Sequence, residues 1–155
     1  MMTLCSDLLK ILQGKTIVTA ESCTGGGIGA AITAVPGSSA IYKGGIISYC
    51  NQLKSELLGV DPFLLREYGA VSEPVAKAMA FGARNFLKSD IAISVTGLAG
   101  PDGDAFGNPV GTVFIGYCDN MHLFSRKYLY SGDRDHIREQ VVIEAIKIAI
   151  EMNSR

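Results

Sequence analysis

Short runs of apolar residues alternate along the chain with longer segments in which apolar residues recur every three or four positions. The short runs predict strands, because they are apolar and are bounded by residues typical of turns; they lie at residues 15–20, 41–50, 91–95, 110–118 and 123–129. The last two surround an Asp-Asn turn and predict a hairpin. The longer segments predict helices at residues 3–13, 28–35, 51–58, 72–87 and from 133 onward, with a short helical turn opening at Asp61 and Pro62.

This order of elements predicts an α/β fold. Helices that separate successive strands cover both faces of a sheet, and the hairpin adds an antiparallel pair, so we expect a mixed sheet. The 155 residues are enough to build a core, and no linker, repeat or low-complexity segment divides them. We therefore expect residues 1–155 to form a single domain.

Composition narrows the function classes. Hydrophobic residues make up 48% of the chain and charged residues 19%, which is typical of a compact enzyme-like domain. The net charge of −1 argues against nucleic acid as a partner. No apolar run approaches the roughly 20 residues of a membrane span, and no leader pattern opens the chain, so we expect no membrane partner and a cytoplasmic location. The cysteines, at positions 5, 23, 50 and 118, lack zinc-site spacing and are expected to be free thiols.

The segment Ala20-Glu-Ser-Cys-Thr-Gly-Gly-Gly carries most of the functional information. It follows a predicted buried strand and precedes a small apolar helix, which is where an α/β protein presents backbone N–H groups to an anion. Ser22 is the candidate nucleophile. The N–H groups around Thr24, Gly25 and Gly26 are candidates to hold either an oxyanion, as acyl-transfer chemistry needs, or another anion such as a phosphate.

A dinucleotide-binding interpretation of the same glycines fails. Gly25, Gly27 and Ala30 match a relaxed fingerprint, but that fingerprint requires an acidic residue about 20 positions later to bind a ribose hydroxyl. No Asp or Glu lies between Glu21 and Glu56, whereas the same stretch contains two lysines. The segment therefore suits an anionic ligand.

A serine nucleophile needs a base, and histidine is a poor candidate here. The chain has only His122, expected at an exposed hairpin turn, and His136, expected on the surface of the last helix. Lysine can serve if burial lowers its pKa toward neutrality. Lys54 is the best candidate because it follows an apolar strand closely, and Tyr49 is placed to orient or relay the proton. An exposed lysine on a short helix is the alternative.

Two further features bear on the ligand. Residues 96–109 form a connection longer than usual, which is typical of a functional or mobile loop. Arg134 and Arg138 lie four apart at the start of the last helix, where the helix dipole disfavours cations. Either acidic neighbours neutralise them, or one of them binds a ligand phosphate, and Arg134 is favoured because it lies nearest the expected rim of the site.

Seven ordered motifs give the chain a resemblance to a known family. From about residue 8 to residue 150 it resembles the CinA C-terminal domain family, also called the PncC-type nicotinamide-nucleotide amidases. The motifs are Ala20-Glu-Ser-Cys-Thr-Gly-Gly, Pro36-Gly-Ser-Ser, the stretch from Gly44 through Ser48, Tyr49 and Asn51 to Lys54, Leu57-Leu-Gly-Val, Gly69-Ala-Val-Ser, Thr96-Gly-Leu-Ala-Gly-Pro and Pro109-Val-Gly.

The resemblance implies a three-layer α/β/α sandwich with a mixed five-stranded sheet. It implies hydrolysis of nicotinamide mononucleotide to nicotinate mononucleotide and ammonia, without metal or cofactor, by a homo-oligomer, a dimer in the family. Ser22 matches the family nucleophile, and Tyr49 and Lys54 match its base partners. With the analysis above, the expected substrate-binding residues are Thr24, Gly25, Gly26, Ser39, Asn51, Thr96, Gly97 and Arg134.

The chain departs from the family pattern at three places. Cys50 replaces a usual serine, Gly27 replaces a larger aliphatic residue, and residues 102–106 are more acidic than usual. Two other functions stay open: a nucleotide-binding regulatory module with little turnover, and an amidase of another substrate or one that uses Cys23. The second is disfavoured because Cys23 is expected to pack inward.

Overall fold

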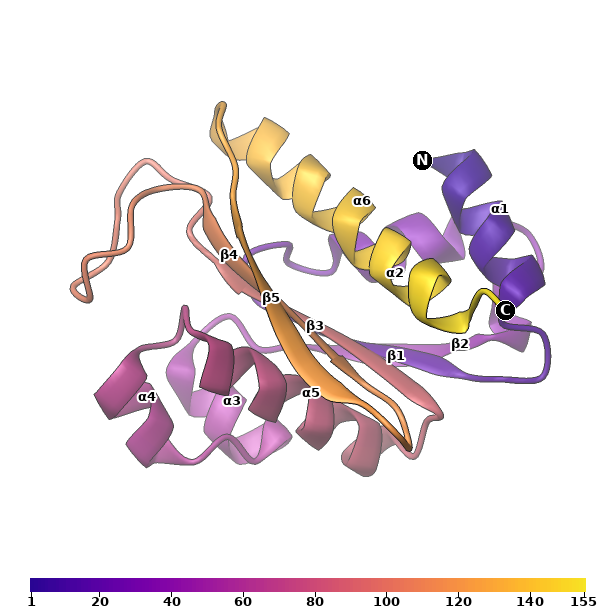
Figure 1. The fold of residues 1–155 in the computed structure, drawn as a ribbon, viewed down its shortest axis with the longest axis horizontal. Helices are drawn as coiled ribbons and strands as arrows, with labels where there is room; N and C mark the ends of the chain where they lie inside the picture. Colours follow the sequence, from indigo (N-terminus) through magenta and orange to yellow (C-terminus); the bar gives the residue numbers. More distant parts are fainter.

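The computed structural model describes residues 1–155 as three layers around one five-stranded sheet (Figure 1). The strand order is β2-β1-β3-β4-β5. Strands β2, β1 and β3 are parallel, and β4 and β5 are antiparallel to their neighbours. The strands are β1 (Ile17–Glu21), β2 (Tyr42–Ile47), β3 (Ile91–Gly97), β4 (Thr112–Cys118) and β5 (Leu123–Leu129). The mixed five-stranded α/β fold is confirmed.

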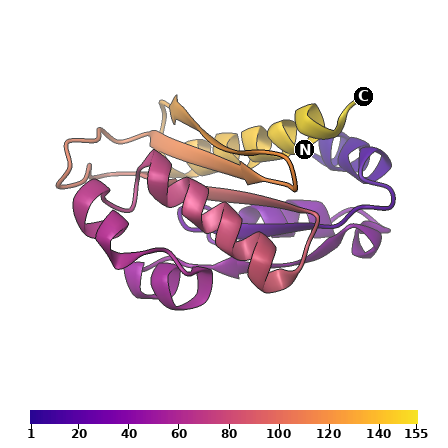
Figure 2. The same ribbon diagram turned by 60° about the horizontal axis from the view of Figure 1, so that its bottom comes forward.

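Helices cover both faces of the sheet, as Figures 1 and 2 show. One layer contains α1 (Met2–Ile11), α2 (Gly27–Thr33) and α6 (Arg134–Asn153). The opposite layer contains α3 (Asn51–Leu58), α4 (Pro62–Tyr68) and α5 (Glu73–Leu87). None of these helices combines the length and apolar character that crossing a lipid bilayer requires.

Burial explains why the central strands are continuous apolar runs. Every residue of β1 is buried, and so is all of β3 except Gly97, because helices cover both sides of these strands. Strand β2 lies at the sheet edge and alternates half-buried with exposed positions. Within the second layer, α5 approaches α3 closely at Gly82, where a Cβ atom would collide with the carbonyl oxygen of Leu58. A glycine is therefore required inside this helix.

Most element boundaries differ from the predicted ones by one to three residues. The largest difference is at the strand predicted over residues 41–50, which ends at Ile47. Its continuation turns away after the Ser48 N–H bonds to the carbonyl of Glu21, so residues 48–50 lead into α3. A short 3-10 helix, Ser38–Ala40, occupies part of the predicted loop before β2.

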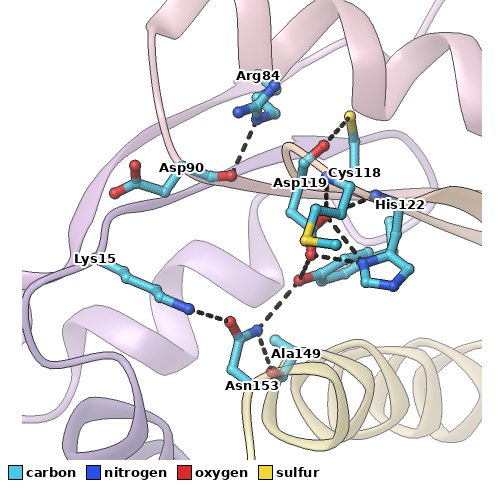
Figure 3. Close-up of polar contacts among 10 residues, drawn as sticks. Lys15, Arg84, Asp90, Cys118, Asp119, His122, Ala149 and Asn153 are labelled. Atoms are coloured by element: carbon cyan, nitrogen blue, oxygen red, sulfur yellow. Dashed lines mark hydrogen bonds and ion pairs between the residues drawn. The ribbon is translucent and has the colours of Figure 1, made fainter.

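A network of hydrogen bonds among polar side chains lies at the end of the sheet where β1 and β3 begin (Figure 3). The buried Tyr117 hydroxyl donates to the Asp119 carboxylate at 2.8 Å and accepts from the Asn153 side chain at 3.2 Å. Lys15 donates to Asn153 Oδ1 at 3.3 Å. His122, predicted to be an exposed turn residue, is instead partly buried with its ring Nδ1 3.1 Å from Asp119. The network ties the β4–β5 turn to the end of α6, far from the carboxyl ends of the parallel strands.

Candidate active site

A cleft of about 340 Å³ opens at the carboxyl ends of β1 and β3. Ligand sites of α/β sheets lie at this edge, because loops that leave the strand ends converge there. The cleft is lined by residues from the turn after β1, the β2–α3 connection, the loop before α5, the loop after β3 and the start of α6. These residues are Ser22, Cys23, Tyr49, Asn51, Lys54, Ala70, Val71, Thr96, Gly97, Leu98, Ala99, Gly100, Pro101, Asp102 and Arg134.

Ser22 and Lys54 meet at the floor of the cleft. The Lys54 Nζ atom lies 3.0 Å from Ser22 Oγ and donates to the carbonyl of Ser48 at 2.7 Å. Lys54 is 1% exposed, and it shares the inward face of α3 with Leu58, four residues later. The structure thus places side by side two residues, 32 positions apart in the sequence, that the sequence analysis predicts to be the nucleophile and its base.

Burial is the main reason that the pKa of Lys54 is lowered from its ordinary value; the nearby Cys50 and Cys23 thiols act in the opposite direction. Both hydrogen-bond acceptors of the amine, a hydroxyl and a carbonyl, are neutral, so neither supplies a counter-charge. A buried amine in this environment releases its proton more readily than a lysine in water. In the neutral form it can accept the proton of Ser22.

The Ser22 turn is built on Glu21, a residue that the sequence analysis did not single out. The Glu21 carboxylate is 2% exposed and accepts from Thr24 Oγ1 at 2.6 Å, from the Ile28 N–H at 2.9 Å and from the Gly29 N–H at 3.1 Å. It thus occupies the N-terminus of α2, where a negative charge is favourable. The signal in the sequence was an acid at the end of a buried strand, directly before a glycine-rich helix start.

This arrangement corrects the expectation that the glycine turn holds a phosphate. Thr24, Gly25 and Gly26 do not line the cleft, and the first helical amides of α2 are already bonded to Glu21. The helix N-terminus is therefore not free to hold a phosphate. Gly25 and Gly26 serve the backbone, because their φ angles of 58° and 99° are in the left-handed region that favours glycine.

Cys23 is a weak nucleophile in this structure. The residue is 7% exposed and belongs to the hydrophobic core, although it also borders the cleft. The prediction that Cys23 packs inward is confirmed. Burial raises the pKa of the thiol to about 12, so it stays protonated at neutral pH. Cys50, by contrast, is exposed at the start of α3.

Tyr49 lines the same cleft but makes no hydrogen bond with Ser22 or Lys54. It is 62% exposed, and its hydroxyl accepts from Arg134 Nη2 at 3.2 Å. Arg134 also donates to the carbonyl of Gly100 at 2.6 Å and so joins the two rims of the cleft. No acidic side chain pairs with Arg134, so its charge remains available to an anionic ligand. Arg138 lies behind the turn instead, bonded to the carbonyls of Cys23 and Thr24.

The remaining predicted binding residues divide into two groups. Asn51, Thr96 and Gly97 line the cleft, with the Thr96 hydroxyl donated to the carbonyl of Ala70 at 2.8 Å. Ser39 does not belong there: it is exposed on the 3-10 helix that precedes β2, at the amino end of the parallel strands. Asp102, which the sequence analysis left without a ligand role, does line the cleft. The structure shows no group of three or more metal-binding side chains.

Comparison with known proteins identifies the family. Residues 2–152 match the model of the CinA C-terminal domain. The chain belongs to this family. It is 50% identical over 133 residues to a CinA-like protein of Geobacter metallireducens, with 86% of this chain and 32% of the relative covered. The chain thus spans about a third of the length of such CinA-like relatives.

One relative has a similar length and a more specific name. The chain is 46% identical over 130 residues to the nicotinamide-nucleotide amidohydrolase PncC of Pseudomonas putida, with 84% of this chain and 81% of that protein covered. Solved structures give the same fold. A CinA superfamily protein of Klebsiella pneumoniae has a TM-score of 0.95 at 30% identity, covering 98% of this chain and 96% of its own. The competence/damage inducible protein CihA of Agrobacterium tumefaciens has a TM-score of 0.94 at 35% identity, covering 98% and 94%.

Proposed function

We propose that this CinA-family domain is an amidohydrolase that converts nicotinamide mononucleotide to nicotinate mononucleotide and ammonia. The observation that carries the proposal is the 3.0 Å contact between Ser22 Oγ and the buried Lys54 amine inside the cleft. A serine beside a lysine of lowered pKa is an activated nucleophile, which acyl transfer requires and a simple binding module does not. The name of the Pseudomonas putida relative supports the substrate.

The proposed reaction proceeds through an acyl-enzyme. Ser22 Oγ attacks the carboxamide carbon while its proton passes to Lys54 Nζ. The tetrahedral intermediate then collapses, the carbon–nitrogen bond breaks, and ammonia leaves with the proton returned by Lys54. A water molecule then attacks the resulting ester while Lys54 takes one of its protons. Lys54 returns that proton to Ser22 Oγ as the ester bond breaks, and the acid product loses its remaining proton to solvent and leaves as the carboxylate.

The cleft offers groups for the rest of the nucleotide. Arg134 lies at its rim and pairs with no carboxylate, so it is the residue that we assign to the 5′-phosphate. Tyr49 and Asn51, from the β2–α3 connection and the start of α3, also line the cleft and are assigned to substrate binding through their polar groups. A volume of about 340 Å³ falls in the range of small-molecule sites.

The test is an ammonia assay with purified protein. Wild type incubated with nicotinamide mononucleotide should release ammonia and nicotinate mononucleotide in equal amounts. Ser22→Ala should release neither while it keeps the wild-type melting temperature, and the control Ser55→Ala, on α3 but outside the cleft, should keep full activity. Saturable binding of the nucleotide by wild type without ammonia release would instead support the regulatory module.

A further inference from the structure

The turn that carries Ser22 is held from behind by one side chain of α6. The Arg138 Nε–H donates to the carbonyl of Cys23 at 3.1 Å, and its Nη2–H donates to the carbonyl of Thr24 at 3.1 Å. Two bonds from one planar guanidinium fix two successive peptide groups of the turn. Arg138 does not line the cleft; with Thr24 and Gly27 it borders a separate hollow between α2 and α6.

The orientation of these peptides determines where their N–H groups point. In a trans peptide the C=O and N–H bonds are antiparallel. Since the Cys23 carbonyl is directed toward Arg138, the Thr24 N–H of the same peptide is directed away from it. The Ser22 carbonyl accepts from the Gly25 N–H at 3.1 Å, so the Cys23 N–H is directed to the outside of that small turn.

Neither of these two N–H groups has a partner in the protein. The N–H groups of Cys23 and Thr24 donate to no backbone or side-chain acceptor, although the two residues are only 7% and 1% exposed. Gly25 and Gly27 donate to turn carbonyls, and Ile28 and Gly29 donate to Glu21. The Gly26 N–H also has no acceptor in the protein, but Gly26 is only half-buried. Buried N–H groups without a partner are rare and call for an explanation.

We propose that Arg138 is a positioning residue for acyl transfer. It holds the carbonyls of Cys23 and Thr24, and so fixes the turn in which the unpartnered N–H of Cys23, at the wall of the cleft beside Ser22, faces the oxygen of the tetrahedral intermediate. The inference rests on the proposed function. When the bond from Ser22 Oγ to the carbonyl carbon forms, the π electrons of the carbonyl move to its oxygen, and the Cys23 N–H donates to that oxyanion. When the electrons return, the carbon–nitrogen bond breaks and the interaction weakens. The donor thus acts mainly in the transition state.

The fork of the guanidinium makes this role specific to arginine. A lysine amine is a single point donor on a flexible stem and does not fix two carbonyls in one plane. Arg138 therefore differs from Arg134, one turn earlier on α6, which points into the cleft and is assigned to the ligand.

The test uses a probe that does not depend on the nucleotide substrate. A small alkyl fluorophosphonate forms a bond from Ser22 Oγ to phosphorus and loses fluoride, while the serine proton passes to Lys54. Its P=O oxygen accepts from the same Cys23 N–H. Intact-mass spectrometry over time gives the rate of Ser22 labelling for wild type, Arg138→Met, Arg138→Lys and the control Arg126→Met, whose arginine pairs with Glu151 on the surface.

Labelling of Arg138→Met should be slower than that of wild type by about tenfold to a hundredfold, less than the full loss of an oxyanion donor, with Arg138→Lys between them. With nicotinamide mononucleotide, kcat should fall by a similar factor and KM should change less than about threefold. Arg126→Met should match wild type in both assays. An unchanged labelling rate in Arg138→Met, or a rise in KM at constant kcat, overturns the proposal. A wild type that is labelled at Ser22 but does not hydrolyse the nucleotide contradicts the proposed substrate and leaves the role of Arg138 measurable.

Discussion

Replacing Glu21 by glutamine tests whether a buried charge holds the nucleophile turn in place. The carboxylate accepts three hydrogen bonds, two at Oε1 from Thr24 and Ile28 and one at Oε2 from the Gly29 N–H at 3.1 Å. Glutamine preserves the size of the side chain and one acceptor oxygen. Its amide nitrogen, however, would face the Gly29 N–H, donor against donor.

The expected loss follows from these contacts. A buried N–H left without an acceptor costs about 1–3 kcal/mol. Removing the negative charge from the first turn of α2 costs a further ~0.3–2 kcal/mol. The neutral side chain regains part of this because it avoids the desolvation of a charge. We expect Glu21→Gln to lower the free energy of unfolding by about 2–4 kcal/mol, which for a chain of this length lowers the melting temperature by about 5–15 °C.

Urea unfolding followed by circular dichroism measures the loss directly. The matched control is Glu67→Gln, because Glu67 is exposed on α4 and makes no side-chain hydrogen bond or ion pair. The control should remain within about 0.5 kcal/mol of wild type. If Glu21→Gln is equally stable, the shape of the turn and not the carboxylate fixes the helix start, and the argument from charge is wrong.

Three other changes have defined outcomes. The first concerns Lys54, whose pKa is lowered in the folded protein. As pH rises from that lowered pKa toward the ordinary value of 10.5, the unfolded chain binds a proton that the folded chain has lost, so the unfolding free energy of wild type should rise relative to that of Lys54→Met. Urea titrations at several pH values measure this difference, and a difference that does not change with pH would contradict a lowered pKa of Lys54. Arg134→Met should weaken calorimetric binding of nicotinamide mononucleotide about tenfold to a hundredfold but leave binding of the phosphate-free riboside nearly unchanged, and equal losses would exclude a phosphate contact. Iodoacetamide at pH 7 should add one label, on Cys50, with Cys23 protected until urea is added; rapid native labelling of Cys23 would mean that its thiol is not held at a pKa of about 12.

Local pattern was sufficient for the elements of this fold and for the pair at the centre of the cleft. Ser22 follows one buried strand and Lys54 lies just after the next, and parallel strands end at the same edge of a sheet. The sequence order therefore already implied their proximity. The hydrophobic pattern does not show which way the Lys54 side chain points. The structure does: Lys54 lies on the inward face of α3, and its amine is 3.0 Å from Ser22 Oγ instead of in solvent.

The same rule places Ser39 outside the cleft. It precedes β2, so it had to lie at the amino end of the parallel strands, away from residues that follow them. Its assignment came from the family motif alone. Glu21 was missed for a different reason. An acidic residue at the end of a buried strand is readable from the sequence, but its three donors come from a turn and helix whose path depends on two left-handed glycines.

The two arginines at the start of α6 show why three-dimensional placement decided what spacing could not. Both lie where the helix dipole disfavours a cation, and no carboxylate pairs with either, so neutralisation by Asp133 and Asp135 is not the explanation. Asp133 instead caps the helix through the N–H of His136.

Each arginine is held by neutral oxygen acceptors of other segments, Arg134 by Gly100 and Tyr49, and Arg138 by the Ser22 turn. Such bonds fix the position of a guanidinium without cancelling its charge. The same helix end therefore presents one positive charge to the cleft and one to the back of the nucleophile turn, which is the arrangement that an anionic substrate and a developing oxyanion both favour.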